Sequence, residues 1–191
     1  MEREIGSQRD ELLAGLSGRI VEVGAGNGAN FRHYPPAVEE VVAVEPEPYL
    51  RAKAEQAARA ASVPVRVIDG TADELPLEPD SIDAAIASLV LCTIPDGPGA
   101  LAEMRRVLKP GGELRFLEHV RSDEPRKARA QRMSDSSGIW PLLGGGCHCS
   151  RDTLAAIETA GYSIERVNSF SLGPSWWITN PHVLGVARAP R

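Results

Sequence analysis

The sequence has little cysteine, few aromatic residues and no long apolar run. Its three cysteines, Cys92, Cys147 and Cys149, are too few and odd in number for a disulfide framework. The longest apolar run, AAIASLVLC, is about half the roughly 18 residues that a membrane span needs. The amino terminus, MEREIGSQRDELL, is charged from its second residue, which excludes a secretory signal. These absences predict a cytoplasmic protein with no integral membrane segment.

The chain also lacks a large excess of either charge. Its 21 basic and 26 acidic residues give a net charge of −5. This charge argues against binding of nucleic acid through a broad, positively charged surface. The basic stretch RKARAQR, residues 126–132, is therefore interpreted as a solvated helix face. With 42% hydrophobic and 25% charged residues, the 191-residue chain has the composition of one folded domain spanning residues 1–191. Nothing in the pattern favours one oligomeric state.

Short β-branched runs alternate with longer alanine-rich helical patterns. This alternation predicts an α/β fold, a doubly wound seven-stranded sheet that is mostly parallel and covered on both faces. The connection between the last two runs is too short for a crossover helix, so the sheet should end in an antiparallel strand. The strands are expected at residues 19–23, 40–44, 64–68, 81–88, 113–120, 163–170 and 182–188.

Residues 121–149 do not follow this alternation of strand and helix patterns. They hold the basic stretch and a glycine-rich turn, GGGCHC, but no strand pattern. We expect this insertion to be a lid or a wall of an acceptor site. Trp140, which lies within it, and Trp176 and Trp177 in the last loop could line an apolar pocket or simply anchor their loops.

A glycine-rich turn follows the first strand, in the segment VEVGAGNGAN. Glycines at alternate positions allow positive φ and close approach of the backbone to a ligand. The spacing of Gly24, Gly26 and Ala29 also matches a dinucleotide fingerprint, so a dinucleotide-dependent oxidoreductase remains open. Glu45, about 20 residues further on, ends the second strand where an acid can accept both ribose hydroxyls. Glu22, inside the first strand, suits a ligand that carries an ammonium and a sulfonium better than it suits a pyrophosphate.

Several further segments carry a resemblance. EVGAGNG, VEPEP, TADELPL, DAAIASLVLCTIPD and MRRVLKPGG occur in this order over residues 19–120. Together they resemble class I S-adenosylmethionine-dependent methyltransferases. NFRHYPP, FLEHV, GGGCHCSRDT and PSWWITNPHVLGVA extend the likeness to the methyltransferase-like thiol S-methyltransferases, over about residues 18–188.

The resemblance implies a Rossmann-like methyltransferase fold, S-adenosyl-L-methionine as cofactor and a small, apolar acceptor molecule. It favours a thiol acceptor. Methylation of a hydroxyl or an amine is the alternative within the same reaction class, and a protein that binds the cofactor without turnover is an alternative outside it.

The resemblance also implies a set of cofactor-binding residues. Glu45 would hold the ribose and Pro46 would lie against the adenine, whose edge would face Thr71 and Ala72. Many relatives have aspartate where Thr71 stands. Here backbone N–H and C=O groups are expected to form the hydrogen bonds to the adenine instead. The residues expected to line or underlie the methionine part are Glu22, Gly24, Ala25, Gly26, Gly28, Ser88 and Leu89.

Two histidines are the catalytic candidates. Methyl transfer from a sulfonium needs an aligned nucleophile, exclusion of water and, for a thiol, removal of a proton. His119 ends the fifth strand, His182 begins the last one, and both match histidines of the resembled group. A structural histidine is the alternative for each. No metal is expected, because Cys147 and Cys149 lack a second ligand pair at the usual spacing; Cys92 is expected to be a small buried apolar residue.

Overall fold

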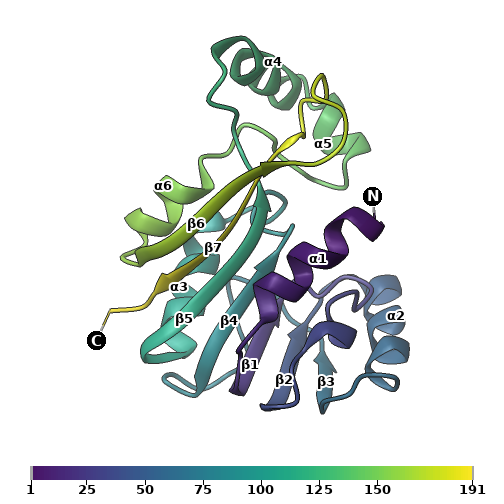
Figure 1. The fold of residues 1–191 in the computed structure, drawn as a ribbon, viewed down its shortest axis with the longest axis vertical. Coiled ribbons are helices and arrows are strands. Elements are labelled where there is room, and N and C mark those ends of the chain that lie inside the picture. The colour runs from purple at the N-terminus through teal and green to yellow at the C-terminus, as the bar shows by residue number, and fades with distance from the viewer. Residues whose placement is uncertain (1, 191) are drawn as a thin grey trace.

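The computed structural model describes the backbone of residues 2–190 and the side chains of residues 5–190. Its centre is a seven-stranded sheet with the strand order β3-β2-β1-β4-β5-β7-β6 (Figure 1). β7 runs antiparallel to both of its neighbours, β5 and β6, whereas the pairs among β1 to β5 are parallel. The predicted mostly parallel sheet with an antiparallel end is therefore confirmed. The strands are β1 (Gly18–Val23), β2 (Val38–Val44), β3 (Val65–Ile68), β4 (Ile82–Ser88), β5 (Leu108–His119), β6 (Ser163–Ser171) and β7 (Pro181–Arg188).

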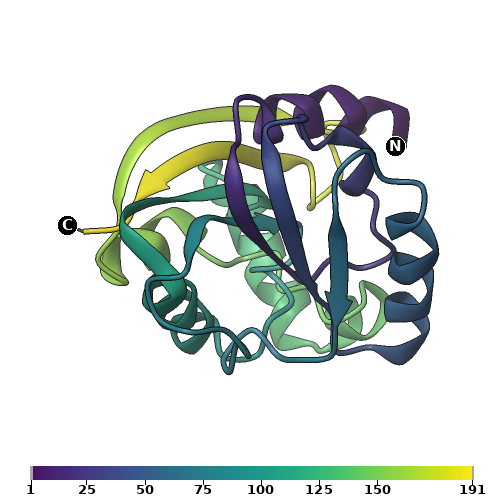
Figure 2. The ribbon, with the colours of Figure 1, turned by 90° about the horizontal axis from the view of Figure 1, so that it is seen from below.

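The central strands are buried because both faces of the sheet are covered. On one face α3 (Gly97–Val107) and α6 (Thr153–Thr159) pack against the core that contains Val21 and Phe116. On the other face lie α1 (Glu2–Leu13), α2 (Pro48–Ala58) and the short η1 (Phe31–His33), over a second core that contains Ile20 and Ile86 (Figure 2). Continuous apolar runs in these strands match this two-sided burial.

Side-chain caps mark where several of the helices begin. Carboxylates cap three of them: Glu47 accepts from the backbone N–H groups of Tyr49 and Leu50 at the start of α2, while Asp96 and Asp152 cap α3 and α6. Such caps satisfy N–H groups that have no partner within the helix. The chain leaves α6 through Gly161, whose φ of +90° is a conformation that favours glycine.

Two elements differ from the prediction. β5 begins at Leu108, five residues before the expected start at Glu113, because Leu108 pairs with Ile82 ahead of a register shift in the β4–β5 ladder. Helix α1 was not expected from the charged amino terminus. It is held by Leu12 and Leu13, both buried, and by Arg115, whose guanidinium donates to the carbonyl oxygens of Leu12 and Ala14.

The insertion at residues 121–149 forms α4 (Pro125–Ser136) and α5 (Ile139–Leu143), which lie at one end of the molecule beside the loop between β6 and β7 (Figure 1). Arg126, Arg129 and Arg132 are exposed on α4, so the interpretation of the basic stretch as a solvated helix face is confirmed. Gln131, on the same helix, is buried: its amide accepts from the Ser122 N–H and donates to the carbonyls of Val120 and Ile178. These bonds attach α4 to the body of the protein. No described helix combines the length and the apolar character that crossing a membrane requires.

Candidate functional site

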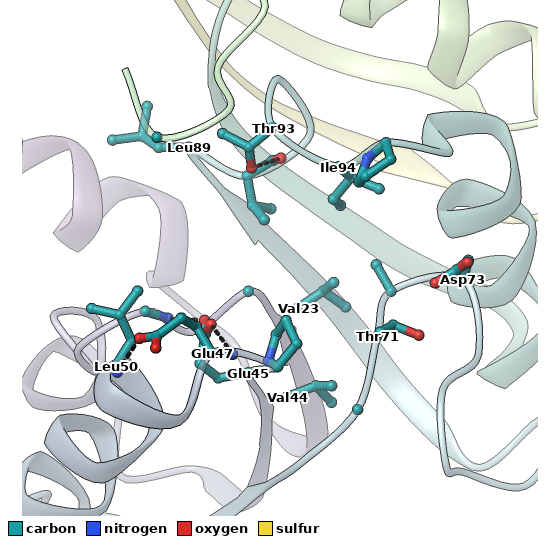
Figure 3. Close-up of a pocket in the computed structure, with 18 of the residues that line it drawn as sticks. Val23, Val44, Glu45, Glu47, Leu50, Thr71, Asp73, Leu89, Thr93 and Ile94 are labelled. Atoms are coloured by element: carbon teal, nitrogen blue, oxygen red, sulfur yellow. Dashed lines mark hydrogen bonds between the residues drawn. The ribbon is translucent and has the colours of Figure 1, made fainter. Parts of the chain in front are cut away.

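Two cavities meet beside the loop that follows β4. The first, of about 760 Å³, lies between the glycine turn after β1, the end of β2, the 70–73 turn and the loop after β4 (Figure 3). The second, of about 780 Å³, is bounded by the ends of β5 and β7, by α5 and by the loop between β6 and β7. Leu89 and Thr93 line both cavities. The site therefore has two compartments with a shared wall at the carboxyl edge of the sheet, where open α/β sheets bind ligands.

The glycine turn supplies one edge of the first cavity. Gly26 has a φ of +58°, and a Cβ built on it would meet no atom within 4 Å, so its backbone is open to a ligand. Gly24 also lines the cavity. Gly28 does not: a Cβ there would collide with the ring of Phe31 and with Ala57, so this glycine serves close packing beneath the turn.

Glu45 closes the other edge of the first cavity. One carboxylate oxygen accepts from the N–H of Gly26 at 2.7 Å, and the other accepts from the N–H of Glu47 at 3.1 Å. The side chain is therefore held between the glycine turn and the start of α2. Each oxygen retains a lone pair, so the carboxylate can still receive the hydroxyls of a sugar.

Of the other residues predicted to bind the cofactor, Pro46, Thr71, Ala72 and Leu89 line the first cavity. The sequence interpretation missed Asp73, which also lines it, across from Glu45 (Figure 3). The signal was present, because Asp73 follows Thr71 by two residues in the same turn. It offers a carboxylate close to where the usual aspartate is replaced by threonine.

Glu22, Ala25 and Ser88 line neither cavity. The Glu22 carboxylate is buried beneath α1 and η1, where it accepts hydrogen bonds from the Asn30 side chain and the Tyr34 hydroxyl, both at 2.8 Å. Burial raises the pKa of Glu22 from its ordinary value of 4.5 to about 7. In this arrangement Glu22 belongs to a polar network inside the protein, and contact with a ligand would require its carboxylate to turn away from these partners.

The two predicted catalytic histidines face each other across the β5–β7 ladder. His119 and His182 are register partners, so their side chains lie on the same face of the sheet, and both line the second cavity. The Nδ1 atom of His182 lies 2.9 Å from the carbonyl oxygen of Asn180, which requires a proton on Nδ1 and leaves the lone pair on Nε2. Burial lowers the pKa of His182, so the ring is held neutral.

His119 is engaged differently. Its Nδ1 atom lies 3.3 Å from the Sγ atom of Cys147, and its buried Nε2 atom has no partner among the described residues. Cys92 completes a group of three whose candidate ligand atoms all lie within 4.8 Å of one another. Cys149 takes no part, because its thiol faces Asp135 at 3.2 Å. The position of Cys92 could have been inferred: it follows β4, and His119 ends the neighbouring parallel strand.

The rest of the second cavity is apolar. Its walls include Trp140 of the insertion and Trp176, Trp177 and Ile178 of the loop between β6 and β7. Ile5, from α1, also reaches it. The tryptophans thus lie where an acceptor pocket requires aromatic surface.

Glu118 holds the loop between the two cavities. It alternates with His119 on β5 and points away from the second cavity, as the strand period requires. One of its carboxylate oxygens accepts from the N–H groups of Val90 and Leu91, at 2.9 and 3.0 Å. These bonds fix the loop directly after Leu89, whose φ of +57° is unusual for a residue with a side chain.

Comparison with known proteins agrees with this geometry. Residues 21–116 match the family described as a methyltransferase domain. The chain is 32% identical to the human thiol S-methyltransferase TMT1A, over 97% of this chain and 77% of that protein, and 34% identical to rat TMT1B with the same coverage. A crystal structure of an S-adenosylmethionine-dependent methyltransferase from Mesorhizobium loti has the same fold, with a TM-score of 0.71 and 20% identity over 96% of this chain and 97% of that one.

The buried Glu22 carboxyl predicts a pH dependence of stability. Its folded-state pKa of about 7 exceeds the ordinary 4.5, so between these values the folded protein retains a proton that the unfolded chain releases. The free energy of unfolding should therefore fall as the pH rises through this window. Glu22→Gln should flatten that slope by up to about 1.4 kcal/mol per pH unit, the equivalent of one proton.

Urea unfolding of the ligand-free protein between pH 5 and pH 8 measures this slope. The lost Tyr34 hydrogen bond shifts the Glu22→Gln curve by a constant, so the slope alone is the readout. Glu55→Gln, on the exposed side of α2, controls for the change in net charge. Identical slopes for the wild type and Glu22→Gln would show that Glu22 is ionised in the folded protein.

Proposed function

This chain belongs to the S-adenosylmethionine-dependent methyltransferase family, and we propose that it methylates the sulfur of a small apolar thiol. The observation that carries the proposal is the pair of cavities that share Leu89 and Thr93. One has the glycine turn and the carboxylate that a nucleoside cofactor requires, and the other is apolar and holds two histidines. Family membership decides against a dinucleotide-dependent oxidoreductase. The names of the thiol S-methyltransferase relatives support a thiol over a hydroxyl or amine acceptor.

We place the cofactor in the first cavity. Glu45 would receive the ribose hydroxyls. The open backbone of Gly24 and Gly26 would lie against the methionine part, and Pro46, Thr71 and Ala72 would surround the adenine. Asp73 is proposed to accept from the exocyclic amine in place of the aspartate that position 71 lacks. Leu89, which lines both cavities, would lie between the cofactor and the acceptor. Ala25, Gly28 and Ser88 do not line this cavity, so their contact with the cofactor stays a prediction, as does contact between Glu22 and the ammonium.

The acceptor occupies the second cavity. Its apolar part lies among the tryptophans, with its sulfur on the histidine side. Between the two histidines, His182 is the better proton acceptor. Its Nε2 lone pair is available, whereas Nδ1 of His119 is turned to Cys147 and Nε2 of His119 is buried away from the cavity. The proton passes from the thiol to His182 Nε2. S-adenosylmethionine would supply the methyl group: the thiolate sulfur would bond to the methyl carbon, and the electron pair of the broken carbon–sulfonium bond would remain on S-adenosylhomocysteine.

The insertion at residues 121–149 is proposed to be an acceptor wall instead of a moving lid. Trp140, Gly144 and Cys147 line the second cavity, and Gln131 and Asp135 tie α4 to neighbouring segments. The apolar lining supports a small-molecule acceptor instead of a nucleic acid. The three free cysteines are consistent with the cytoplasmic location that the sequence predicts.

A panel of acceptors tests the function. Purified protein and S-adenosylmethionine are incubated with matched aryl and alkyl compounds that carry a thiol, a hydroxyl or an amine, and the methylated products are measured. The thiol of each set should give the highest kcat/KM. Preference for the hydroxyl or amine member would overturn the thiol assignment, and absence of any product would leave a protein that only binds the cofactor.

Glu45→Ala should weaken the binding of S-adenosylhomocysteine by about 1.5–3 kcal/mol, the scale for loss of a charged hydrogen-bonding partner. Isothermal calorimetry measures the change, with Glu39→Ala on the exposed side of the same strand as the control. Unchanged affinity in Glu45→Ala, or tight binding of NAD with no response to S-adenosylhomocysteine, would contradict the assignment of the first cavity.

His182→Ala should lower turnover with a high-pKa thiol by roughly 10²–10⁴-fold, the range for loss of a general base. The loss should shrink for a thiol that is already ionised at the assay pH, because no proton then has to be removed. Affinity for S-adenosylhomocysteine should stay unchanged. His148→Ala, outside both cavities, is the control. Equal losses for the two thiols would show that His182 only positions the acceptor.

A further inference from the structure

We propose that Cys92, His119 and Cys147 form a binding site for one thiophilic divalent cation of the zinc class, with a coordination position left open to the second cavity. The acceptor thiol would bind at that position as a thiolate. This last step rests on the proposed function, whereas the cation site itself does not.

The fold brings the three side chains together from separate parts of the chain. Cys92 lies in the loop after β4, His119 ends β5, and Cys147 follows α5. Their candidate ligand atoms are all within 4.8 Å of one another, and Nδ1 of His119 lies 3.3 Å from Sγ of Cys147. Since metal–sulfur and metal–nitrogen bonds of zinc are roughly 2.0–2.3 Å long, one ion can reach all three with small side-chain adjustments.

The donor set is specific in its chemistry. Two cysteine sulfurs and one imidazole nitrogen favour zinc over magnesium or calcium, which take oxygen ligands. Zinc sites with three protein ligands keep a fourth tetrahedral position for a substrate or water. Here all three residues line the apolar second cavity, so the fourth position would face the acceptor.

The surrounding charges agree with a cation. The sulfurs of Cys92 and Cys147 lie within 4.8 Å of each other, and two thiolates this close repel unless a positive charge lies between them. A divalent cation supplies that positive charge. Arg151 opposes it, but its guanidinium is bound to the carbonyl oxygens of Leu91 and Ile94.

The two nitrogens of His119 fit a cation at Nδ1. The Nε2 atom is buried and has no partner among the described side chains and backbone groups, while Nδ1 faces the sulfur of Cys147. With the proton of the neutral ring on Nε2, the lone pair of Nδ1 is left for a cation. A cation held by the ring and both sulfurs would also explain why an imidazole is placed against a pair of thiols.

A cation here would activate the thiol directly. A thiol that coordinates a metal loses its proton, which His182 can receive and pass to solvent. The thiolate sulfur then forms a bond to the methyl carbon while the carbon–sulfonium bond breaks, so the negative and positive charges cancel. The resulting neutral thioether is a weaker ligand than a thiolate and leaves the cation.

Cobalt(II), a coloured substitute for zinc, tests the site without donor or acceptor. Reduced, metal-free protein should bind one equivalent per chain, with sulfur-to-cobalt charge-transfer absorption and the visible bands of a tetrahedral ion, and zinc should displace it. Cys92→Ser, His119→Ala and Cys147→Ser should each weaken binding at least tenfold. Cys149→Ser, which removes a buried thiol outside the cluster, should bind as the wild type does.

S-adenosylhomocysteine binding and thermal unfolding verify that each variant folds. No stoichiometric binding, binding insensitive to the three cluster variants, or a Cys92–Cys147 disulfide forming in place of binding would overturn the cation site. A disulfide would identify the cluster as a redox pair instead.

The acceptor step is tested separately on the cobalt-loaded protein. Addition of an acceptor thiol should shift the visible bands, while its hydroxyl analogue should leave them unchanged. No shift would overturn thiol coordination, and full methylation of thiols by the metal-free protein would overturn activation by the cation while the proposed function stands. Loaded protein that binds the cation but methylates no thiol would refute the proposed function and leave the cation site intact.

Discussion

Both cavities depend on one buried carboxylate. Glu118 accepts from the backbone N–H groups of Val90 and Leu91, which are the first groups after the unusual conformation at Leu89. A buried N–H without a partner costs about 1–3 kcal/mol, so the two bonds determine where the loop after β4 can run. That loop supplies Leu89 and Thr93 to both compartments and Cys92 to the second. The hydrogen bonds of Glu118 therefore fix the wall that separates the two cavities.

The sequence predicts the sheet well because local signals and tertiary burial agree along it. Apolar runs such as RIVEV and SIDAAIAS become central strands, and proline and glycine mark the ends of the helices between them. The prediction fails at α1, where charged residues hide the helical spacing of the apolar ones. In α1, Ile5 and Leu12 lie about two helical turns apart among charged residues, and the helix forms because these side chains reach the core.

The site is predictable only in part, for a different reason. Residues that act within one turn, such as Gly24 with Gly26, are visible as a motif, and Glu45 is visible from the end of its strand. The direction in which a carboxylate points is not local information. Asn30 and Tyr34 draw Glu22 away from the first cavity, and the meeting of Cys92 with Cys147 depends on how the insertion folds back over β4.

The antiparallel direction of β7 has a consequence for how such an enzyme diversifies. Because β7 reverses, the loop between β6 and β7 returns to the same edge as the glycine turn, and it joins the insertion as the main wall of the second cavity. Apart from Gly145, the residues that line the first cavity all lie between positions 23 and 96, whereas most of the second cavity comes from positions 119–182. Lengthening or exchanging these later segments can change the shape of the second cavity while leaving the first cavity almost untouched. Gene-level exchange of the later segments is thus a direct route to new acceptors.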